Sequence, residues 1–454
     1  MQLIFQAGIA CVKGEVLVEM EGDKVRHTIL QTPRGLADLV GREVALMHLI
    51  EEKLSKLLAS WGYQEVHTPT IEFADVLAKG SEGELKDAFC FIDRQGDLVA
   101  LRPEMTTPCA RLLASRLLSQ PMPIRLFYAG RVFRYEEPQE GRNREFRQIG
   151  VELAGLPAPV GDAEVVALAV HAFETLGLED FQFTVSHIGI LEGLLEAAGI
   201  DKEDRHRLAH LLRRGDFVAY RRAVGELAKG SLGEILAEIP RLRGEASLVK
   251  ELEERLAKEQ ASLGLSNARR ALFELSTIFE LLEIYGVLSY VKVDLGMVKD
   301  FTYYTGLIME GYTADLGYTI ASGGRYDQLL KSFGRSAPAS GWALGVERLL
   351  LALERQGKLP KIEEKCEVLI TPQAGTKEHW PQALALAKEL RKLGYPTEVN
   401  PVLDPGRAMQ MAKEREVNVL IDYSSEPKAV FFPSEKTTSI EDAVQLLKGG
   451  VNCG

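Results

Sequence analysis

The sequence lacks the features of membrane, secreted and disulfide-rich proteins. It contains no run of about 18 uncharged apolar residues, so no membrane-spanning helix is predicted. The opening MQLIFQAGIACVKGEVLVEMEGDK has no basic segment ahead of its apolar residues, unlike a signal peptide. The five cysteines are scattered and never form a C-x-x-C pair, which argues against a zinc ribbon or a disulfide scaffold. These absences predict a cytoplasmic protein.

Several catalytic motifs are also absent. The chain has no G-x-x-x-x-G-K-S/T or G-x-G-x-x-G loop, and no Ser–His–Asp set, paired-carboxylate hydrolase signature or cysteine–histidine nucleophile. His206 and His210 lie four apart on a predicted helix, but DKEDRHRLAHLLRR lacks the glutamate of H-E-x-x-H. A solvated helix face is therefore favoured over a metal site. We expect no catalytic nucleophile, no metal and no cofactor.

The bulk composition is that of a globular protein of several domains. A length of 454 residues suits two or three domains, and 46% apolar with 26% charged residues is close to the globular average. The formal net charge of −11 argues against a generally basic surface, although it is compatible with a local basic patch. We therefore expect neither a nucleic-acid partner nor a membrane partner.

Changes in pattern along the chain predict its domains. Strand and helix signals alternate irregularly over residues 32–187 and 283–356, which we interpret as one α+β core. Near its start, Leu46, Met47, Ile50, Leu54, Leu57, Leu58 and Trp61 form the apolar stripe of a predicted helix that ends at Gly62. Between the two core segments, at 188–282, leucine, alanine and charged residues dominate and strand signals vanish, which predicts an all-helical insertion with turns near Gly199, Gly230 and Gly264. Residues 1–31 are predicted to form short strands. After a Lys/Glu-rich linker, strands alternate with helices over 365–454, which predicts a small α/β domain with a partly parallel sheet.

The most informative stretch is GRVFRYEEPQEGRNREFRQIGVELAG, from Gly130 to Gly155. Its alternation predicts strands over 126–134 and 146–153 joined by a polar loop, which would form an antiparallel hairpin with a charged tip. Arginine forks bind phosphate or carboxylate bidentately, so the hairpin is a candidate anion-binding site. A solvated charged hairpin is the alternative. The arginines concerned are Arg131, Arg134, Arg142, Arg144 and Arg147.

Other clusters are predicted to meet the hairpin on one sheet. In LRPEMTTP, Glu104 and Thr106 supply a carboxylate and a hydroxyl that suit an α-amino group. The alternative there is a helix N-cap at Thr106 with a surface ion pair at Arg102. On the hairpin, Gln148 and Glu152 share one strand face by period two.

The remaining clusters contain tyrosines, glycines and further cations. In SGGRYD and GWALGVERL, glycines permit close backbone approach and Arg325 and Arg348 are predicted to point into a cleft. The third cluster consists of Lys299, Asp300, Tyr303, Tyr304 and Thr305. Tyr303 and Tyr304 have a second interpretation, as residues of the core and its rim rather than ligand contacts. All these side chains suit binding of an amino acid or a nucleotide phosphate better than nucleophilic attack.

Six ordered blocks resemble the motifs of the histidyl-tRNA synthetase-like class II fold. They are GYQEV, LRPEMTTP, VFRYEEPQEGRNREFRQIGVELAG, YYTG, GGRYD and ALGVERLL, spread over about residues 30–355. The resemblance implies a class II aminoacyl-tRNA synthetase-like antiparallel sheet flanked by helices. It also covers the position of the helical insertion. The C-terminal α/β domain resembles an anticodon-binding domain.

Two families share this pattern: histidyl-tRNA synthetase and the regulatory subunit of ATP phosphoribosyltransferase. Met105 replaces the glycine of the synthetase block LRPEGT, as in the regulatory subunits. In MVKDFTYYTG, Lys299 stands where the synthetase has a catalytic arginine, and Asp300 stands where it has glycine. A lysine cannot reproduce a bidentate fork, and the adjacent carboxylate disfavours a bound phosphate. Glu137 likewise replaces a cation of the synthetase block RHERPQ.

The resemblance also implies binding residues. Glu104, Thr106 and Gln148 would hold the amino and carboxylate ends of histidine. Glu152 and Tyr304, next to Tyr303, would hold its imidazole. Arg134, Arg142, Lys299 and Arg348 would form a vestigial phosphate site. The retention of Arg134 and Arg348 favours an enzyme, unless these arginines are kept for folding or partner contacts.

We interpret the chain as a non-catalytic regulatory subunit of ATP phosphoribosyltransferase. It would act with the short-form catalytic subunit in the first step of histidine biosynthesis and transmit feedback inhibition by histidine. The resemblance implies a dimer of this subunit within a hetero-oligomer. The alternatives are an authentic histidyl-tRNA synthetase, which the extra C-terminal domain slightly favours, and a stand-alone histidine- or tRNA-binding module. Whether histidine binds in the synthetase-like pocket or at a subunit interface stays open.

Overall fold

The computed structural model describes Ile9–Val12, Glu15–Val18 and residues 31–449, with short gaps at 81–84, 86, 136, 138–142, 261, 300–303, 363–366, 375–376, 403–404 and 424–426. The chain divides into two compact units, Met1–Pro360 and Lys361–Gly454. Among the described residues, no helix combines the length and the apolarity needed to cross a membrane.

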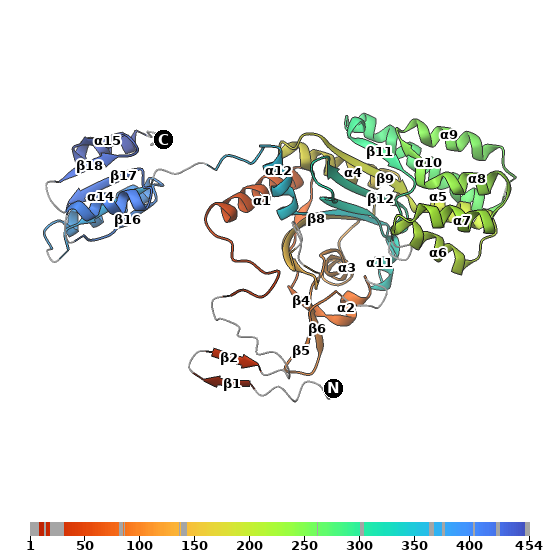
Figure 1. Cartoon of the computed structure of the whole chain (residues 1–454), viewed down its shortest axis with the longest axis horizontal. Coiled ribbons are helices and arrows are strands. Elements are labelled where there is room, and N and C mark those ends of the chain that lie inside the picture. Colours follow the sequence, from red (N-terminus) through yellow and green to blue (C-terminus); the bar gives the residue numbers. More distant parts are fainter. Residues whose placement is uncertain are drawn as a thin grey trace. The chain divides into compact units, whose positions relative to one another are not determined.

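A nine-stranded sheet forms the centre of the first unit (Figure 1), in the order β10-β11-β9-β12-β13-β14-β8-β7-β3. Its strands are β3 (Gln64–Glu65), β7 (Ile124–Phe133), β8 (Glu145–Ala154), β9 (Phe181–His187), β10 (Arg243–Gly244), β11 (Val291–Asp294), β12 (Leu307–Thr313), β13 (Ala321–Arg325) and β14 (Ala339–Gly345). The pairs β9–β11 and β3–β7, at its flanks, are parallel, and the others are antiparallel. The predicted α+β class is confirmed, with a sheet that is mixed rather than purely antiparallel.

The predicted hairpin is the antiparallel pair β7–β8, in which Leu126 lies opposite Glu152 and Gly130 opposite Gln148. Because side chains alternate along a strand, β8 presents different residues to its two faces. Ile149, Val151 and Leu153 join the main apolar core. Gln148 and Glu152 therefore lie on the opposite face, where a site can form.

Four helices cover the core face of the sheet: α1 (Arg42–Ser60), α4 (Val160–Thr175), α10 (Leu263–Ile284) and α12 (Val346–Arg355). The predicted apolar stripe of α1 is confirmed, since Leu46, Ile50 and Leu54 are buried. The helix ends at Ser60, and Gly62, two residues later, has a φ of +82° that favours glycine. Helix α4 is buried on nearly all sides, because it packs between the sheet and neighbouring helices.

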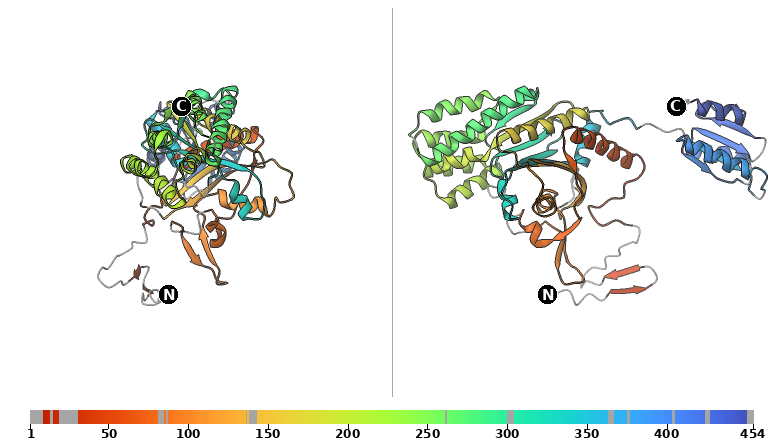
Figure 2. Two further views of the ribbon diagram at one scale, coloured as in Figure 1. Left: turned by 90° about the vertical axis from the view of Figure 1, so that its right-hand side faces the viewer. Right: turned by 180° about the vertical axis from the view of Figure 1, so that it is seen from behind.

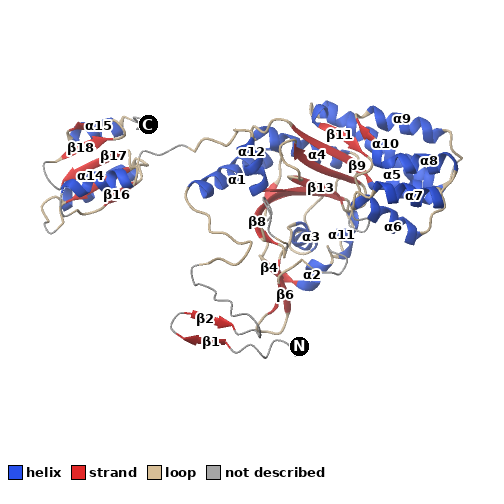
Figure 3. Ribbon diagram, in the orientation of Figure 1, coloured by secondary structure: helices blue, strands red, loops and turns tan. Residues whose placement is uncertain are grey.

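The other face carries α3 (Thr106–Ala114), α2 (Ala74–Ala78), α11 (Asp327–Ser332) and a small sheet of β4 (Ile71–Phe73), β6 (Leu98–Leu101) and β5 (Cys90–Ile92). Figure 3 shows α3 and α4 on opposite sides of the large sheet. Met105 and Cys109 pack against Tyr128 and Val132 of β7. This packing fixes the start of α3 next to the polar face of β8.

The insertion consists of α5 (Ile188–Ala197), α6 (Lys202–Arg213), α7 (Phe217–Leu227), α8 (Gly230–Glu238), α9 (Ser247–Ala257) and α10, which Figure 2 shows grouped at one end of the large sheet. It is not wholly helical, because β10 lies within it and pairs with β11. Two residues that extend an existing sheet edge leave no periodic signal in a sequence. Gly264, where a turn was predicted, lies inside α10.

The second unit is the predicted α/β fold with a partly parallel sheet. Its elements are β15 (Val368–Pro372), α13 (Trp380–Lys392), β16 (Thr397–Val399), α14 (Pro405–Glu414), β17 (Val419–Tyr423), β18 (Lys428–Phe431), β19 (Lys436–Thr438) and α15 (Ile440–Lys448). Strands β16, β15 and β17 are parallel, and β18 and β19 are antiparallel additions. The sequence did not reveal β19. Near the N-terminus, β1 (Ile9–Val12) and β2 (Glu15–Val18) form a two-stranded antiparallel sheet.

Candidate functional site

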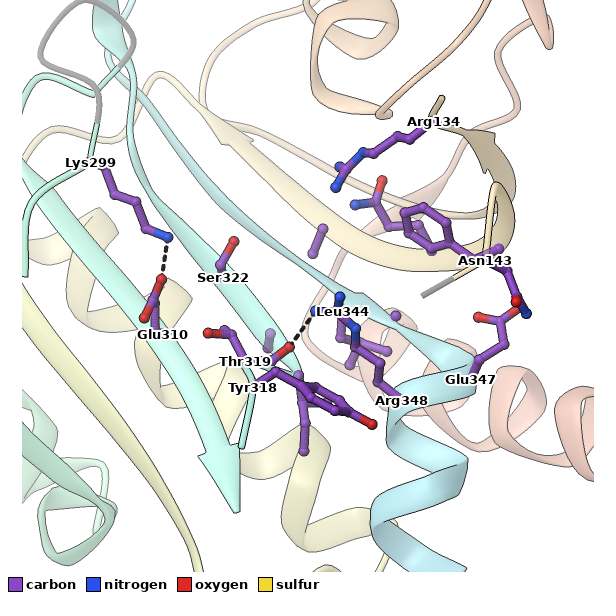
Figure 4. A pocket seen from close by; sticks show the side chains of 16 residues that line it. Arg134, Asn143, Lys299, Glu310, Tyr318, Thr319, Ser322, Leu344, Glu347 and Arg348 are labelled. Atoms are coloured by element: carbon purple, nitrogen blue, oxygen red, sulfur yellow. Dashed lines mark hydrogen bonds and ion pairs between the residues drawn. The ribbon is translucent and has the colours of Figure 1, made fainter. Parts of the chain in front are cut away.

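A cavity of about 400 Å³ opens over β8, β12, β13 and β14 beside the start of α12 (Figure 4). Its polar lining consists of Arg134, Asn143, Gln148, Lys299, Glu310, Tyr318, Thr319, Ser322, Glu347 and Arg348. Strands, the loops beside them and helix α12, all distant in sequence, supply these side chains. The cavity thus combines three of the predicted cations with Gln148, the predicted amide residue.

Two arginines are held on the cavity wall by backbone carbonyls and aromatic rings. Arg134 Nε donates a hydrogen bond of 2.9 Å to the carbonyl of Pro103, and its guanidinium lies 5.2 Å from the Phe146 ring centre. Arg348 Nη1 donates a 2.8 Å hydrogen bond to the Thr319 carbonyl, and its guanidinium lies over Tyr318. Such contacts restrict the rotamers of both side chains and keep two positive charges in the cavity.

The third cation has a carboxylate partner. Lys299 Nζ forms an ion pair with Glu310 of β12, on the opposite wall from Arg134 (Figure 4). The Lys299 and Glu310 side chains are 30% and 24% exposed, so the pair is partly shielded from water. Its neighbours Asp300 and Tyr303, and Arg142 of the hairpin, lie outside the described residues. The positive charge predicted at Lys299 is thus locally neutralised.

A buried carboxylate lies under α3, and we call its surroundings the Glu152 cradle, made of Glu152, Thr106, Tyr128 and Tyr326. The Tyr128 hydroxyl donates to one carboxylate oxygen at 3.3 Å, and the Tyr326 hydroxyl donates to the other. Glu152 is only 2% exposed. Gly341 of β14 faces it, and a Cβ there would lie 2.2 Å from the Val151 carbonyl oxygen and 2.4 Å from Glu152 Oε2. Glycine is therefore required opposite this carboxylate.

The surroundings of the Glu152 cradle raise the pKa of its carboxyl and of the neighbouring Tyr304 phenol. Burial raises the pKa of Glu152 well above its usual range, and the negative charge of Glu104 adds to this shift. Hydrogen bonds from Thr106 and Tyr128 lower the pKa and only partly offset the burial. Burial also raises the pKa of the Tyr304 phenol, with Glu152 as the largest charge contribution. Tyr304 and Glu104 therefore belong to the electrostatic surroundings of Glu152.

Glu104 acts as a helix cap in this structure. Both of its carboxylate oxygens accept the backbone N–H of Thr107 at 3.1 Å. The N-cap position is occupied by Met105, and Thr106 is the first residue of α3. The alternative of an N-cap at Thr106 is therefore wrong. Instead, the Thr106 hydroxyl is directed to Glu152.

Arg102 and Arg325, two of the predicted site arginines, are both buried. Arg102 is 5% exposed and donates hydrogen bonds to the Thr68 and Arg131 carbonyls, so the expected surface ion pair at Arg102 is absent among the described contacts. Arg325 does not line the cavity of Figure 4. It is paired with Asp162 at 2.8 Å and with Asp327 at 3.0 Å.

The exposed end of the hairpin fits the alternative of a solvated charged surface. Arg131 pairs with Glu145 at 2.8 Å and remains 61% exposed. The Arg144 guanidinium lies 4.3 Å from the Tyr135 ring centre. Only Arg134 among the described hairpin arginines lines the cavity. The exposed residues of this stretch thus form a charged surface, and Arg134 stays a predicted anion-binding residue.

Comparison with known proteins identifies the family. Residues 35–349 match the family model of histidyl-tRNA synthetase. The chain is 43% identical to the ATP phosphoribosyltransferase regulatory subunit of Moorella thermoacetica, over 71% of this chain and 82% of the relative. It is 40% identical to the subunit of the same name from Desulforamulus reducens, over 79% of this chain and 87% of the relative. The chain belongs to the family of ATP phosphoribosyltransferase regulatory subunits.

A solved structure agrees with this family assignment. The ATP phosphoribosyltransferase regulatory subunit/histidyl-tRNA synthetase from Bacillus halodurans C has a TM-score of 0.76 and 30% identity, covering 87% of this chain and 98% of that one. The resemblance predicted from six sequence blocks is therefore confirmed, together with the class II fold. Within this family's fold, the Lys299–Glu310 pair and the Glu152 cradle are two separate features of one sheet face.

Gln148 links the cavity and the cradle along β8. It lines the cavity, is 8% exposed, and its Oε1 accepts no hydrogen bond within the described part of the chain. A buried carbonyl oxygen without a donor is costly unless a ligand or water supplies one. Gln148 is therefore the predicted site residue whose hydrogen bonding is visibly incomplete.

Sequence reasoning missed two members of the cradle, Tyr128 and Tyr326. Tyr326 lies in the quoted GGRYD block, and Tyr128 shares the alternation that places Leu126 and Gly130 on the polar face. The available signal was this strand period, which assigns Tyr128 to the same face as Glu152. Their hydroxyls complete the hydrogen bonding of the carboxylate.

Proposed function

We propose that the chain is a non-catalytic regulatory subunit that acts with a short-form ATP phosphoribosyltransferase catalytic subunit. In this role it enables the first step of histidine biosynthesis and transmits feedback inhibition by histidine. The names of the relatives with 40–43% identity support the regulatory role. The observation in the site that carries the proposal is the Lys299–Glu310 ion pair.

The ion pair works against amino-acid activation. Forming an acyl-adenylate requires fixed cations that stabilise charge developing on the α-phosphate of ATP. Lys299 supplies a point charge rather than an arginine fork, and that charge is already compensated by Glu310. A phosphate at this position would have to displace a carboxylate and remain near it. The cavity thus keeps two arginines but lacks an available third cation among its described lining residues.

The Glu152 cradle supports histidine as the effector. Glu152 and Tyr304 suit the two nitrogens of an imidazole, and Gln148 has an acceptor without a partner. Glu104 and Thr106 lie at the same helix start and suit the ends of the amino acid. Feedback inhibition follows if histidine binds two assembly states of the complex with different affinity. In this proposal the subunit forms a dimer within the hetero-oligomer.

Histidyl-tRNA synthetase is the second candidate, favoured by Arg134 and Arg348 on the cavity wall. Two assays of the full chain separate the candidates. The regulatory role predicts no histidine-dependent ATP–pyrophosphate exchange with Mg²⁺. It also predicts that adding the chain to a short-form catalytic subunit raises phosphoribosyl-ATP synthesis, which histidine then inhibits. Robust exchange, or no effect on the catalytic subunit, would overturn the proposal.

A further inference from the structure

A second cavity, of about 520 Å³, lies where the helical insertion meets the core. We call it the junction cavity. Helices α5, α6 and α10 form one side, and the ends of β9 and β13 with the start of α11 form the other. It shares no lining residue with the cavity of Figure 4. The proposed function therefore leaves it unexplained.

Close packing of α5 on α10 aligns two polar rows along this cavity. Gly193 and Gly264 allow the contact, because a Cβ on Gly193 would lie 2.5 Å from the Ala268 nitrogen. Residues three or four apart then share one face of each helix. These rows consist of Glu192 and Glu196 on α5, and Asn267, Arg270 and Glu274 on α10.

Some polar side chains of this lining form hydrogen bonds with other groups of the protein. Asn267 donates a hydrogen bond of 3.2 Å to Glu196. His187 Nδ1 accepts the Gly189 N–H, so Nε2 carries the proton and donates to Glu274 at 3.1 Å. These contacts give Glu196 and Glu274 structural roles.

Two other charged groups of the lining, Glu192 and Arg270, are exposed to solvent, and the positive charge of Arg205 acts on Glu192. Across the described residues, the side chains of Glu192 and Arg270 make no hydrogen bond or ion pair. Arg205 Nε donates a hydrogen bond of 2.7 Å to the Ile200 carbonyl. The cavity thus presents a carboxylate and two guanidinium groups toward one space.

We infer that the junction cavity binds a free amino acid with a basic side chain. A ligand carboxylate fits the guanidinium forks of Arg270 and Arg205, and a ligand ammonium fits Glu192. The lining contains four carboxylates (Glu192, Glu196, Glu274 and Asp327) and three guanidiniums (Arg205, Arg270 and Arg325), so a ligand of net positive charge balances it. The volume falls in the range of about 300–1,000 Å³ found for small-molecule sites.

The junction cavity borders the same two chain segments that hold the Glu152 cradle. Arg325 lines the cavity, and the next residue, Tyr326, donates to Glu152. Thr305 lines it too, and the preceding Tyr304 belongs to the surroundings of Glu152. An amino acid in the junction cavity therefore contacts segments that position the cradle. Binding itself does not rest on the proposed regulatory function.

Calorimetry of the full chain tests this site. L-arginine and L-histidine are the probes, with L-glutamate as the charge-reversed control, at pH 6, where histidine is mainly protonated. The Glu152→Gln background reduces the contribution of the cradle. We expect a basic probe to bind this background, and the further changes Glu192→Gln and Arg270→Gln to weaken it at least tenfold. Arg222→Gln with Glu280→Gln, both exposed on the insertion, is the matched control and should leave binding unchanged.

Three results would overturn the inference: no basic probe binds the Glu152→Gln chain, the Glu192→Gln and Arg270→Gln changes have no effect, or L-glutamate binds as well as the basic probes. Glu192→Gln alone serves if the combined variant does not fold, and it should weaken binding severalfold. The assay contains no catalytic subunit, so its failure would leave the proposed function untouched. Conversely, failure of the phosphoribosyltransferase assay would leave this site intact.

Discussion

At the scale of a single residue, the raised pKa of Glu152 makes the stability of the folded chain depend on pH. Burial holds the pKa of its carboxyl above the ordinary value of 4.5 in the folded state. Such a group favours folding at low pH, and this contribution is lost as the pH rises from about 4.5 through the folded-state pKa. Each unit of difference corresponds to about 1.4 kcal/mol.

A Glu152→Gln variant should therefore gain stability relative to the parent as the pH is raised. We expect the melting temperature of the variant minus that of the parent to be higher at pH 8 than at pH 5, because glutamine does not ionise. Scanning calorimetry at the two pH values measures it. Glu280→Gln, an exposed change, should show no such trend. A difference that is independent of pH would mean that Glu152 ionises normally.

The Lys299–Glu310 pair allows a second test at the residue scale. Glu310→Gln removes the carboxylate that compensates Lys299, so the cavity gains a net positive charge. We expect roughly tenfold tighter binding of inorganic pyrophosphate, about 1.4 kcal/mol, since the freed ammonium joins two fixed arginines. Titration calorimetry measures it. The control Glu203→Gln lies on α6 away from the cavity. Unchanged affinity would show that Glu310 does not limit anion binding.

At the scale of elements, two glycines in insertion helices should respond oppositely to alanine. Gly193→Ala places a Cβ 2.5 Å from a backbone nitrogen of α10, so we expect a loss of about 1–3 kcal/mol. Gly225→Ala meets nothing within 4 Å in α7 and should stabilise by about 0.5–1 kcal/mol. Urea denaturation of both variants measures the free energies of unfolding. Equal effects would contradict the close contact between α5 and α10.

Elements were predicted well where the signal is local and periodic. The apolar stripe predicted for α1 is buried, and the alternation of β7 and β8 predicted the bounds of these strands to within about two residues. Strand β10 and the position of Gly264 inside α10 escaped prediction. Both depend on pairing or packing with partners far away in the sequence, which local periodicity does not report.

At the scale of the whole molecule, each unit has its own apolar core. Leu369, Val419 and Ile421 belong to cores formed within the second unit. We therefore expect a chain ending at Pro360 to fold and to keep histidine binding in the cradle. Circular dichroism melting and calorimetry with L-histidine measure both properties. Loss of binding in a well-folded truncated chain would show that residues 361–454 contribute to the site.

The sequence by itself determined the fold class and the family, because ordered motifs and periodic burial are properties of contiguous segments. Only the tertiary structure decided which charges meet. Glu152 meets Tyr326, 174 positions away, and Arg325 meets Asp162, 163 positions away. Strand order and register bring these groups together, and both are fixed by the burial of the whole sheet rather than by neighbours along the chain.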